Sequence, residues 1–429
     1  MSEDPKISWR LHKFQFWLFN LTGLGPNNYK SKLIRILYDG YSYTISLMYI
    51  LYSVMTVTDM AQDLSEEFGV ILLRSSILII GLAIACKRSS LAIEGRREIS
   101  RLNDTMQEMI DALTRKRLKW VTLIVVDHYK LYCKIVISFY ILGMVTATIF
   151  IGGTTYFDVD LFPLPYAHLY TVFGGLMYWW QCIMVIFTYI SFLSYDMVIF
   201  SILSRITTYQ EIVCTNWINF AVNFPSINFN KYISQYGEPV KLNKYDDTTE
   251  LLNFVTKNRM RSYDENMRYD KDLMKKSTAF FRESCIHYQN ITSVLRRVST
   301  MFNVQLLLHF MFGVIVVALM SVTVILGDIR SVGSHRIVCF LVCALYDITI
   351  YCYYGTKLEA SHTAVAAAVF NCPWYEMNVE NRKAIVPIIH SLQHKGTISA
   401  GGFFPVNFTS CLSFYKISYN FIALLRSAT

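Results

Sequence analysis

Apolar residues gather in seven long segments of this 429-residue chain, and polar stretches separate them. A helix that spans a bilayer needs about 20 mostly apolar residues, a length that each segment approaches or exceeds. The segments cover residues 41–57, 68–86, 132–153, 168–203, 301–327, 337–354 and 403–425. They predict an all-α, polytopic membrane protein with seven transmembrane helices.

The fourth segment, residues 168–203, is too long for one bilayer. We therefore expect part of it to project beyond the membrane as a water-exposed helix. The chain opens on polar residues without an apolar signal segment, so the first spanning helix is expected to direct its own insertion.

The segments between the predicted spans differ in charge: alternate segments, starting with the N-terminal segment, together contain nearly all of the lysine and arginine residues. Of these residues, 34 lie in residues 1–37, 87–130, 205–298 and 357–404, whereas two lie in residues 59–67, 153–167 and 327–336. Because cytoplasmic loops are enriched in Lys and Arg, this pattern predicts a cytoplasmic N-terminus and an extracellular C-terminus. That orientation is opposite to the orientation of receptors coupled to G proteins, and it counts against that class.

The composition agrees with a membrane protein. Hydrophobic residues make up 53% of the chain and charged residues 17%, below the fraction of about 25% that is typical of soluble domains. The net charge of +9 could indicate nucleic-acid binding in a soluble protein. Here the basic residues lie on predicted cytoplasmic connections that face anionic lipid, so we expect no nucleic-acid partner.

The two large cytoplasmic connections predict a helical anchor layer. Residues 251–298 are charged and helix-favouring with spaced apolar positions, and residues 381–394 predict a short amphipathic helix. Such a layer is a candidate assembly surface; the alternative is a monomer with solvated loops. We divide the chain into an N-terminal segment with helices one to four (1–204), a cytoplasmic loop and anchor (205–300), helices five and six (301–358), a cytoplasmic connection (359–402) and a pore-lining helix (403–429).

The sequence carries no motif of a known enzyme class that we could identify. It has no phosphate-binding loop, no Gly-x-Ser-x-Gly and no His-Glu-x-x-His. Its ten cysteines show neither a metal-binding spacing nor a disulfide framework. We therefore expect no catalysis, no cofactor and no metal site.

Ionisable residues inside predicted spans are candidate functional residues, because a charge in a bilayer is costly. Arg74 could reach the outer surface, pair with Asp347 or line a cavity. Asp347 is expected to form a buried polar cluster with Tyr346 and Tyr351, either as a structural ion pair or as a ligand contact. Asp196 is expected near or below the inner interface.

The outer halves of spans two, three, four and six are rich in aromatic, methionine and small residues. A pocket for a small, mostly apolar ligand needs such a lining, although ordinary helix packing and interfacial aromatic belts have the same composition. The candidate ligand-binding residues are Ile71, Arg74, Tyr140, Gly143, Met144, Ala147, Phe173, Met177, Trp180, Phe340 and Tyr346.

The last span is more polar than the others. Polar side chains in a bilayer must face protein or water, so several copies of this helix around one axis could enclose a pore. An apolar ring at Ile422 or Leu425, near the outer end, would gate such a pore by dewetting. The candidate pore residues are Ser418, Ile422, Leu425 and Arg426.

The C-terminal third of the chain resembles the insect odorant receptors. The similar motifs, in the family's order and spacing, are Tyr-Cys-Tyr-Tyr-Gly (351–355), Cys-Pro-Trp-Tyr (372–375), Arg-Lys (382–383), Ala-Gly-Gly-Phe-Phe-Pro-Val (400–406), Ser-Tyr (418–419) and Leu-Leu-Arg-Ser (424–427). Residues 420–423 (Asn-Phe-Ile-Ala) depart from the aromatic residues and Thr common there, which leaves the narrowest pore ring open.

The resemblance implies the odorant-binding subunit of a tetrameric, odorant-gated, non-selective cation channel in the cell membrane of olfactory sensory neurons. It implies a central anchor in residues 251–300, 355–370 and 379–395, a pore along 403–426, and a pocket for a small volatile among spans two, three, four and six.

That family contains a shared co-receptor and many odorant-tuned receptors. The last residues of this chain, Leu-Leu-Arg-Ser-Ala-Thr, resemble an odorant-tuned receptor, whose partner would be the co-receptor. The related gustatory receptors carry Thr-Tyr followed by Gln-Phe, and here Ser418-Tyr419 is followed by no Gln-Phe. A gustatory-like channel subunit, a receptor coupled to G proteins and a transporter are the alternatives.

Overall fold

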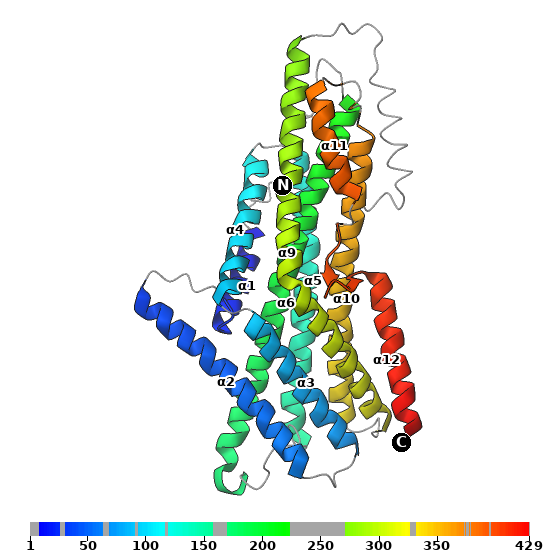
Figure 1. Ribbon diagram of the computed structural model, residues 1–429. Helices are drawn as coiled ribbons and strands as arrows, with labels where there is room; N and C mark the ends of the chain where they lie inside the picture. The colour runs from blue at the N-terminus through cyan, green and yellow to red at the C-terminus, as the bar shows by residue number, and fades with distance from the viewer. Residues whose placement is uncertain are drawn as a thin grey trace.

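A computed structural model describes most of the chain. The described residues are 8–25, 31–62, 68–90, 93–115, 119–157, 170–223, 271–326, 332–372, 374, 377, 379–393 and 396–428. Their elements are α1 (Ser8–Leu21), α2 (Lys32–Gln62), α3 (Phe68–Ser90), α4 (Ile93–Arg115), α5 (Lys119–Phe157), α6 (Tyr170–Asn223), α9 (Lys271–Leu326), α10 (Val332–Phe370), α11 (Val379–Gln393), β1 (Ser399–Ala400), β2 (Phe404–Pro405) and α12 (Phe408–Ala428). The molecule is an elongated helical bundle (Figure 1).

Each of the seven predicted spans falls on its own long helix, in the order α2, α3, α5, α6, α9, α10 and α12. Within the described residues, four helices contain stretches long and apolar enough to cross a membrane: Trp120–Ile149, Ile186–Phe220, Thr278–Ile325 and Ile337–Phe370. The prediction of an all-α, polytopic membrane protein is confirmed.

Three helices are much longer than the apolar segments that predicted them. α9 has 56 residues and α6 has 54, which correspond to roughly 80 Å of helix against a hydrocarbon layer of about 30 Å. α6, α9 and α10 therefore run without a break across the boundaries drawn at 204/205, 300/301 and 358/359. In Figure 1 the upper parts of these helices lie together with α11.

The extension of α6 is buried, so the prediction that it is exposed to water is wrong. Nearly every residue from Ser194 to Phe220 is buried. Polar residues in this stretch have partners on neighbouring helices, since Arg205 donates from Nη1 to Asn103 Oδ1 at 2.7 Å and Ser361 donates from Oγ to Gln210 Oε1 at 2.5 Å. Neighbouring helices, rather than water, therefore satisfy its polar groups.

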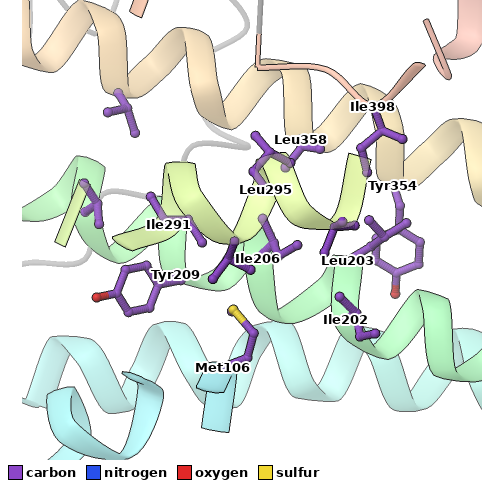
Figure 2. Packing of buried hydrophobic residues seen from close by; sticks show 14 of the residues in the cluster. Met106, Ile202, Leu203, Ile206, Tyr209, Ile291, Leu295, Tyr354, Leu358 and Ile398 are labelled. Atoms are coloured by element: carbon purple, nitrogen blue, oxygen red, sulfur yellow. The ribbon is translucent and has the colours of Figure 1, made fainter. Parts of the chain in front are cut away.

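α4 was not predicted, although its sequence carries a clear helical signal. The buried residues Ile99, Leu102, Met106, Ile110 and Leu113 recur every three or four positions on one face. Figure 2 shows how this face joins the core, with Met106 beside side chains of α6 and α9. The segment escaped prediction because it is too polar on its other face to resemble a span. α1 was not predicted either.

The last helix begins later than the predicted position at residue 403. Residues 399–405 form a small antiparallel hairpin in which Ser399 pairs with Pro405 and Ala400 with Phe404. Gly401 and Gly402 make its turn with φ of 65° and 74°, a conformation that cannot continue a right-handed helix. α12 then starts at Phe408, where the Ser410 backbone N–H donates to Asn407 Oδ1 at 3.0 Å and caps the first turn.

The predicted short helix at 381–394 corresponds to α11. It buries Ile385, Ile388 and Leu392 despite Pro387 within it, and it packs on α9 and α10. Residues 251–270 of the predicted anchor lie outside the described residues.

Candidate functional site

A cavity of about 100 Å³ lies between α3, α5, α6, α9 and α10. One water molecule needs roughly 10–15 Å³ of such space, so the cavity can hold a small organic molecule. Its lining is almost entirely apolar and consists of Ile80, Ala83, Phe139, Gly143, Thr188, Tyr189, Phe192, Leu193, His309, Phe312, Gly313, Val316, Phe340, Cys343, Ala344, Asp347 and Ile348.

The cavity is deep in the bundle. Phe340 and Val316 lie roughly 12–15 Å along their helices from Val332 and Leu326, the ends that face the predicted outer side. In a hydrocarbon layer of about 30 Å this depth is close to the middle of the membrane. A ligand there would be surrounded by helices and shielded from bulk water.

Two of the predicted ligand-binding residues, Gly143 and Phe340, line the cavity. Tyr346 lies just behind the lining, because its ring stacks on Phe139 with centroids 5.8 Å apart. Gly143 matters sterically, since a Cβ there would approach Leu193 Cδ1 to 3.2 Å. The space next to α5 therefore depends on this glycine.

Three other predicted residues on α5 are not brought to the cavity. Tyr140 turns toward α1, where its ring meets Phe14 edge-on with centroids 6.4 Å apart. Met144 is 66% exposed, and Ala147 is half-buried outside the lining. The side chains of the remaining candidates on α3 and α6, Ile71, Arg74, Phe173, Met177 and Trp180, lie outside what the structure describes.

One wall of the cavity was missed from the sequence. α9 contributes His309, Phe312, Gly313 and Val316, whereas span five was not among the predicted pocket helices. A histidine and a glycine inside an otherwise apolar segment were the available signal. Neither residue alone distinguishes a cavity wall from a packed helix.

Charged side chains adjoin the inner end of the cavity. Lys87 Nζ donates to both carboxylate oxygens of Asp196, at 2.8 and 2.9 Å, and the Tyr351 hydroxyl donates to Asp196 Oδ1 at 2.5 Å. His309 Nε2 lies 3.1 Å from Asp347 Oδ2. These side chains join α3, α6, α9 and α10 through a buried polar network.

This network supplies partners for two of the ionisable residues that the sequence singled out. Asp196 lies in the core, where it pairs with Lys87 in the last turn of α3. Of the residues in the predicted polar cluster, Tyr346 pairs its hydroxyl with Ser138 Oγ at 2.6 Å, and Tyr351 donates its hydroxyl to Asp196. The side chain close to Asp347 is His309, from a helix that the prediction left out.

α12 has one packed face and one exposed face. On the packed face Phe414 stacks on Phe310 of α9 with centroids 4.8 Å apart, and the hydroxyls of Tyr415 and Thr349 lie 2.7 Å apart. Ser418 is 4% exposed and Ile422 packs against Leu319 and Val322 of α9. These two predicted pore residues therefore face their own chain.

The exposed face of α12 carries a different set of polar side chains. They recur every three or four residues and are Thr409, Ser413, Lys416 and Asn420. The other two predicted pore residues, Leu425 and Arg426, belong to α12, but their side chains are outside the described part of the chain.

Comparison with known proteins shows which proteins the C-terminal part of the chain resembles. Residues 254–419 match the family model for the 7tm Odorant receptor. Odorant receptor 85b of Drosophila melanogaster is 26% identical over 153 residues, which cover 36% of this chain and 39% of that protein. The C-terminal part of the chain is therefore similar in sequence to the odorant receptors. The Odorant receptor coreceptor of Aedes albopictus is 22% identical to this chain over 157 residues, which cover 37% of the chain and 32% of the coreceptor.

These alignments span about two-fifths or less of the curated relatives, whereas the fold of this chain agrees over nearly its whole length with a solved structure. That structure is the insect olfactory receptor OR5 from Machilis hrabei in complex with eugenol, with a TM-score of 0.66, 10% identity and coverage of 98% of both chains. The shared fold therefore includes α2, α3, α5 and α6, which lie outside the match to the family model.

Proposed function

We propose that this chain is the odorant-binding subunit of a ligand-gated, non-selective cation channel that assembles with an odorant co-receptor in olfactory sensory neurons. The observation that supports this most strongly is the apolar cavity between five helices. A small volatile molecule would be largely desolvated there, and shape would decide most of its affinity. Similarity to receptors and coreceptors of the same family supports the partnership.

Helix α9 both lines the cavity and packs against α12. Phe312 and Val316 of α9 line the cavity, while Phe310, Leu319 and Val322 of α9 contact α12. A ligand that fits the open arrangement of α9 better than the closed one shifts the population toward the open state. Odorant binding would in this way move α12.

The exposed polar face of α12 is the proposed pore surface. With a cytoplasmic N-terminus and one α12 from each of four subunits around an axis, Ser413, Lys416 and Asn420 would face water. Ser418 and Ile422 would instead hold α12 on its own subunit.

Filling the cavity should abolish the response to odorants. Ala344 lines the cavity on α10, whereas Val342 on the same helix is 46% exposed. We expect Ala344→Trp to remove odorant-evoked cation current in cells that also express the co-receptor, because the indole occupies the space of the ligand. The matched control Val342→Trp should respond as the wild type does, at equal surface expression.

Two results would contradict the proposed function. One is full odorant-evoked current from Ala344→Trp, and the other is strong current from this subunit without the co-receptor. The response of Val342→Trp shows whether a loss comes from the cavity or from a tryptophan on α10 in general.

Cysteine accessibility can test the proposed pore face. Ser413 is exposed on α12 and Ser418 is buried. We expect a charged thiol reagent to block the current of Ser413→Cys channels. The same exposure should leave the current of Ser418→Cys channels unchanged. Wild-type channels are the background control. Faster block of Ser418→Cys would place the pore on the face that was predicted from the sequence.

A further inference from the structure

We propose that Asp347 binds the polar head of the odorant, so that the receptor favours small apolar molecules that carry one hydrogen-bond donor, an amine or a hydroxyl. The proposal rests on the proposed function of the cavity as the odorant site. It adds the chemical class of the ligand and the side chain that selects it.

Asp347 lines the cavity and is 2% exposed. Its Oδ2 lies near His309 Nε2, but its Oδ1 is buried and has no hydrogen-bond partner among the described residues. A buried carboxylate oxygen without a donor is strongly unfavourable, because burial removes its water and nothing replaces it. A ligand donor in the cavity would supply the missing hydrogen bond.

The neighbouring charges do not satisfy this carboxylate. The Lys87 ammonium group is hydrogen-bonded to both carboxylate oxygens of Asp196. Asp196 also accepts from Tyr351. Within the described network there are thus two carboxyl groups and one ammonium group. Asp196 accepts hydrogen bonds from Lys87 and Tyr351, whereas Asp347 has only His309 nearby in this network. A protonated amine in the cavity would add a positive charge where one is needed.

Besides His309 Nε2, the Tyr189 hydroxyl is a competing polar group in the cavity. It too is buried without a hydrogen-bond partner among the described residues, and it could donate to a ligand carbonyl. We favour Asp347 because a protonated amine in the cavity would pair with its carboxylate form, and such charge-assisted hydrogen bonds are roughly twice as strong as those between neutral groups. The Tyr189 hydroxyl can offer a ligand only a neutral hydrogen bond.

The test uses four probes that share one aromatic ring: benzylamine, benzyl alcohol, benzaldehyde and toluene. Their equilibrium binding to the full-length receptor in lipid nanodiscs is measured by ligand-observed NMR titration, which needs no channel activity. We expect the two donors to bind about tenfold or more tighter than benzaldehyde and toluene, the change expected from one hydrogen bond to a charged group. The ratio of benzylamine to benzyl alcohol shows whether a charge or a hydroxyl is preferred.

Asp347→Asn should remove most of the preference for benzylamine and leave toluene affinity within about twofold, since it keeps the shape of the side chain but not its charge. The matched control Asp104→Asn replaces an exposed carboxylate on α4 and should change nothing. Size-exclusion profiles confirm that the variants fold. If Asp347→Asn does not fold, the order of the four probe affinities for the wild-type receptor tests the proposal.

Equal affinities for the four probes, absence of binding, or a donor preference that persists in Asp347→Asn would overturn the proposal. A preference for benzaldehyde that Tyr189→Phe removes would assign recognition to Tyr189 instead. Failure of the channel proposal is separate, because it would appear as missing current from a receptor that still ranks the probes as expected.

Discussion

Lys87→Met is expected to destabilise the receptor by about 3–5 kcal/mol, the effect of removing one partner from a buried ion pair. Lys87 and Asp196 are both buried, so removing the ammonium leaves a buried carboxylate without its ion-pair partner. The Lys87 ammonium also lies 3.9 Å from the centroid of the Phe192 ring, so the substitution loses a cation–π contact as well. The temperature at which half of the purified receptor is lost from its size-exclusion peak measures the effect.

Two further variants separate the buried charge from ordinary side-chain loss. Arg101→Met removes an exposed ion pair with Glu98 on α4, whose nitrogen–oxygen distance is 3.2 Å, and should change stability by less than about 1 kcal/mol. Lys87→Met combined with Asp196→Asn should recover much of the loss, because no unpaired charge remains in the core. A single variant as stable as the wild type would show that the ion pair does not hold α3 on α6.

Gly355→Ala should separate α12 from α10 and abolish channel current. A Cβ at residue 355 would lie 1.7 Å from the carbonyl oxygen of Val406, a backbone atom that cannot rotate away. Val406 is held in turn, because its N–H donates to the Ile398 carbonyl at 2.9 Å. Overpacking usually lowers the free energy of unfolding by about 1–3 kcal/mol. A clash with a backbone atom should cost the upper value of this range or more. Odorant-evoked current and thermal stability should both fall.

The matched control for this prediction is Gly40→Ala on α2, where a Cβ meets nothing within 4 Å. Alanine in an exposed helix interior is favoured over glycine by about 0.5–1 kcal/mol, so this variant should be as stable as the wild type or slightly more stable. If Gly355→Ala behaves like Gly40→Ala, the close approach of α10 to the start of α12 is not needed for assembly.

Much of the fold could be predicted from local sequence. The errors of the prediction have a common cause. The seven apolar segments each gave a helix, but α6 and α9 extend far beyond them because their polar ends pack on protein rather than on water. Composition cannot distinguish a polar residue with a partner from a solvated one. Arg205 is an example, since its partner Asn103 lies on α4, a helix that was not predicted.

The candidate site was predicted less completely than the fold. Gly143 and Phe340 were identified because small and aromatic residues suit a cavity, yet Met144 has the same character and faces outward. On α12 the sequence indicated a polar helix correctly, but Ser418 and Ser413 cannot be assigned to faces without the neighbours. The pairing of Asp196 with Lys87 joins residues that are distant in the chain.

The sequence by itself determined the seven apolar helices and the separation of charged connections from apolar segments. It could do so because the thickness of a bilayer sets segment length, and length is a local property. Only the tertiary structure decided which side of each helix faces a cavity, a neighbour or the surroundings. α6 is apolar on all sides, so no periodicity fixes its rotation, and the packing of α3, α9 and α10 around it creates both the cavity and its buried charges.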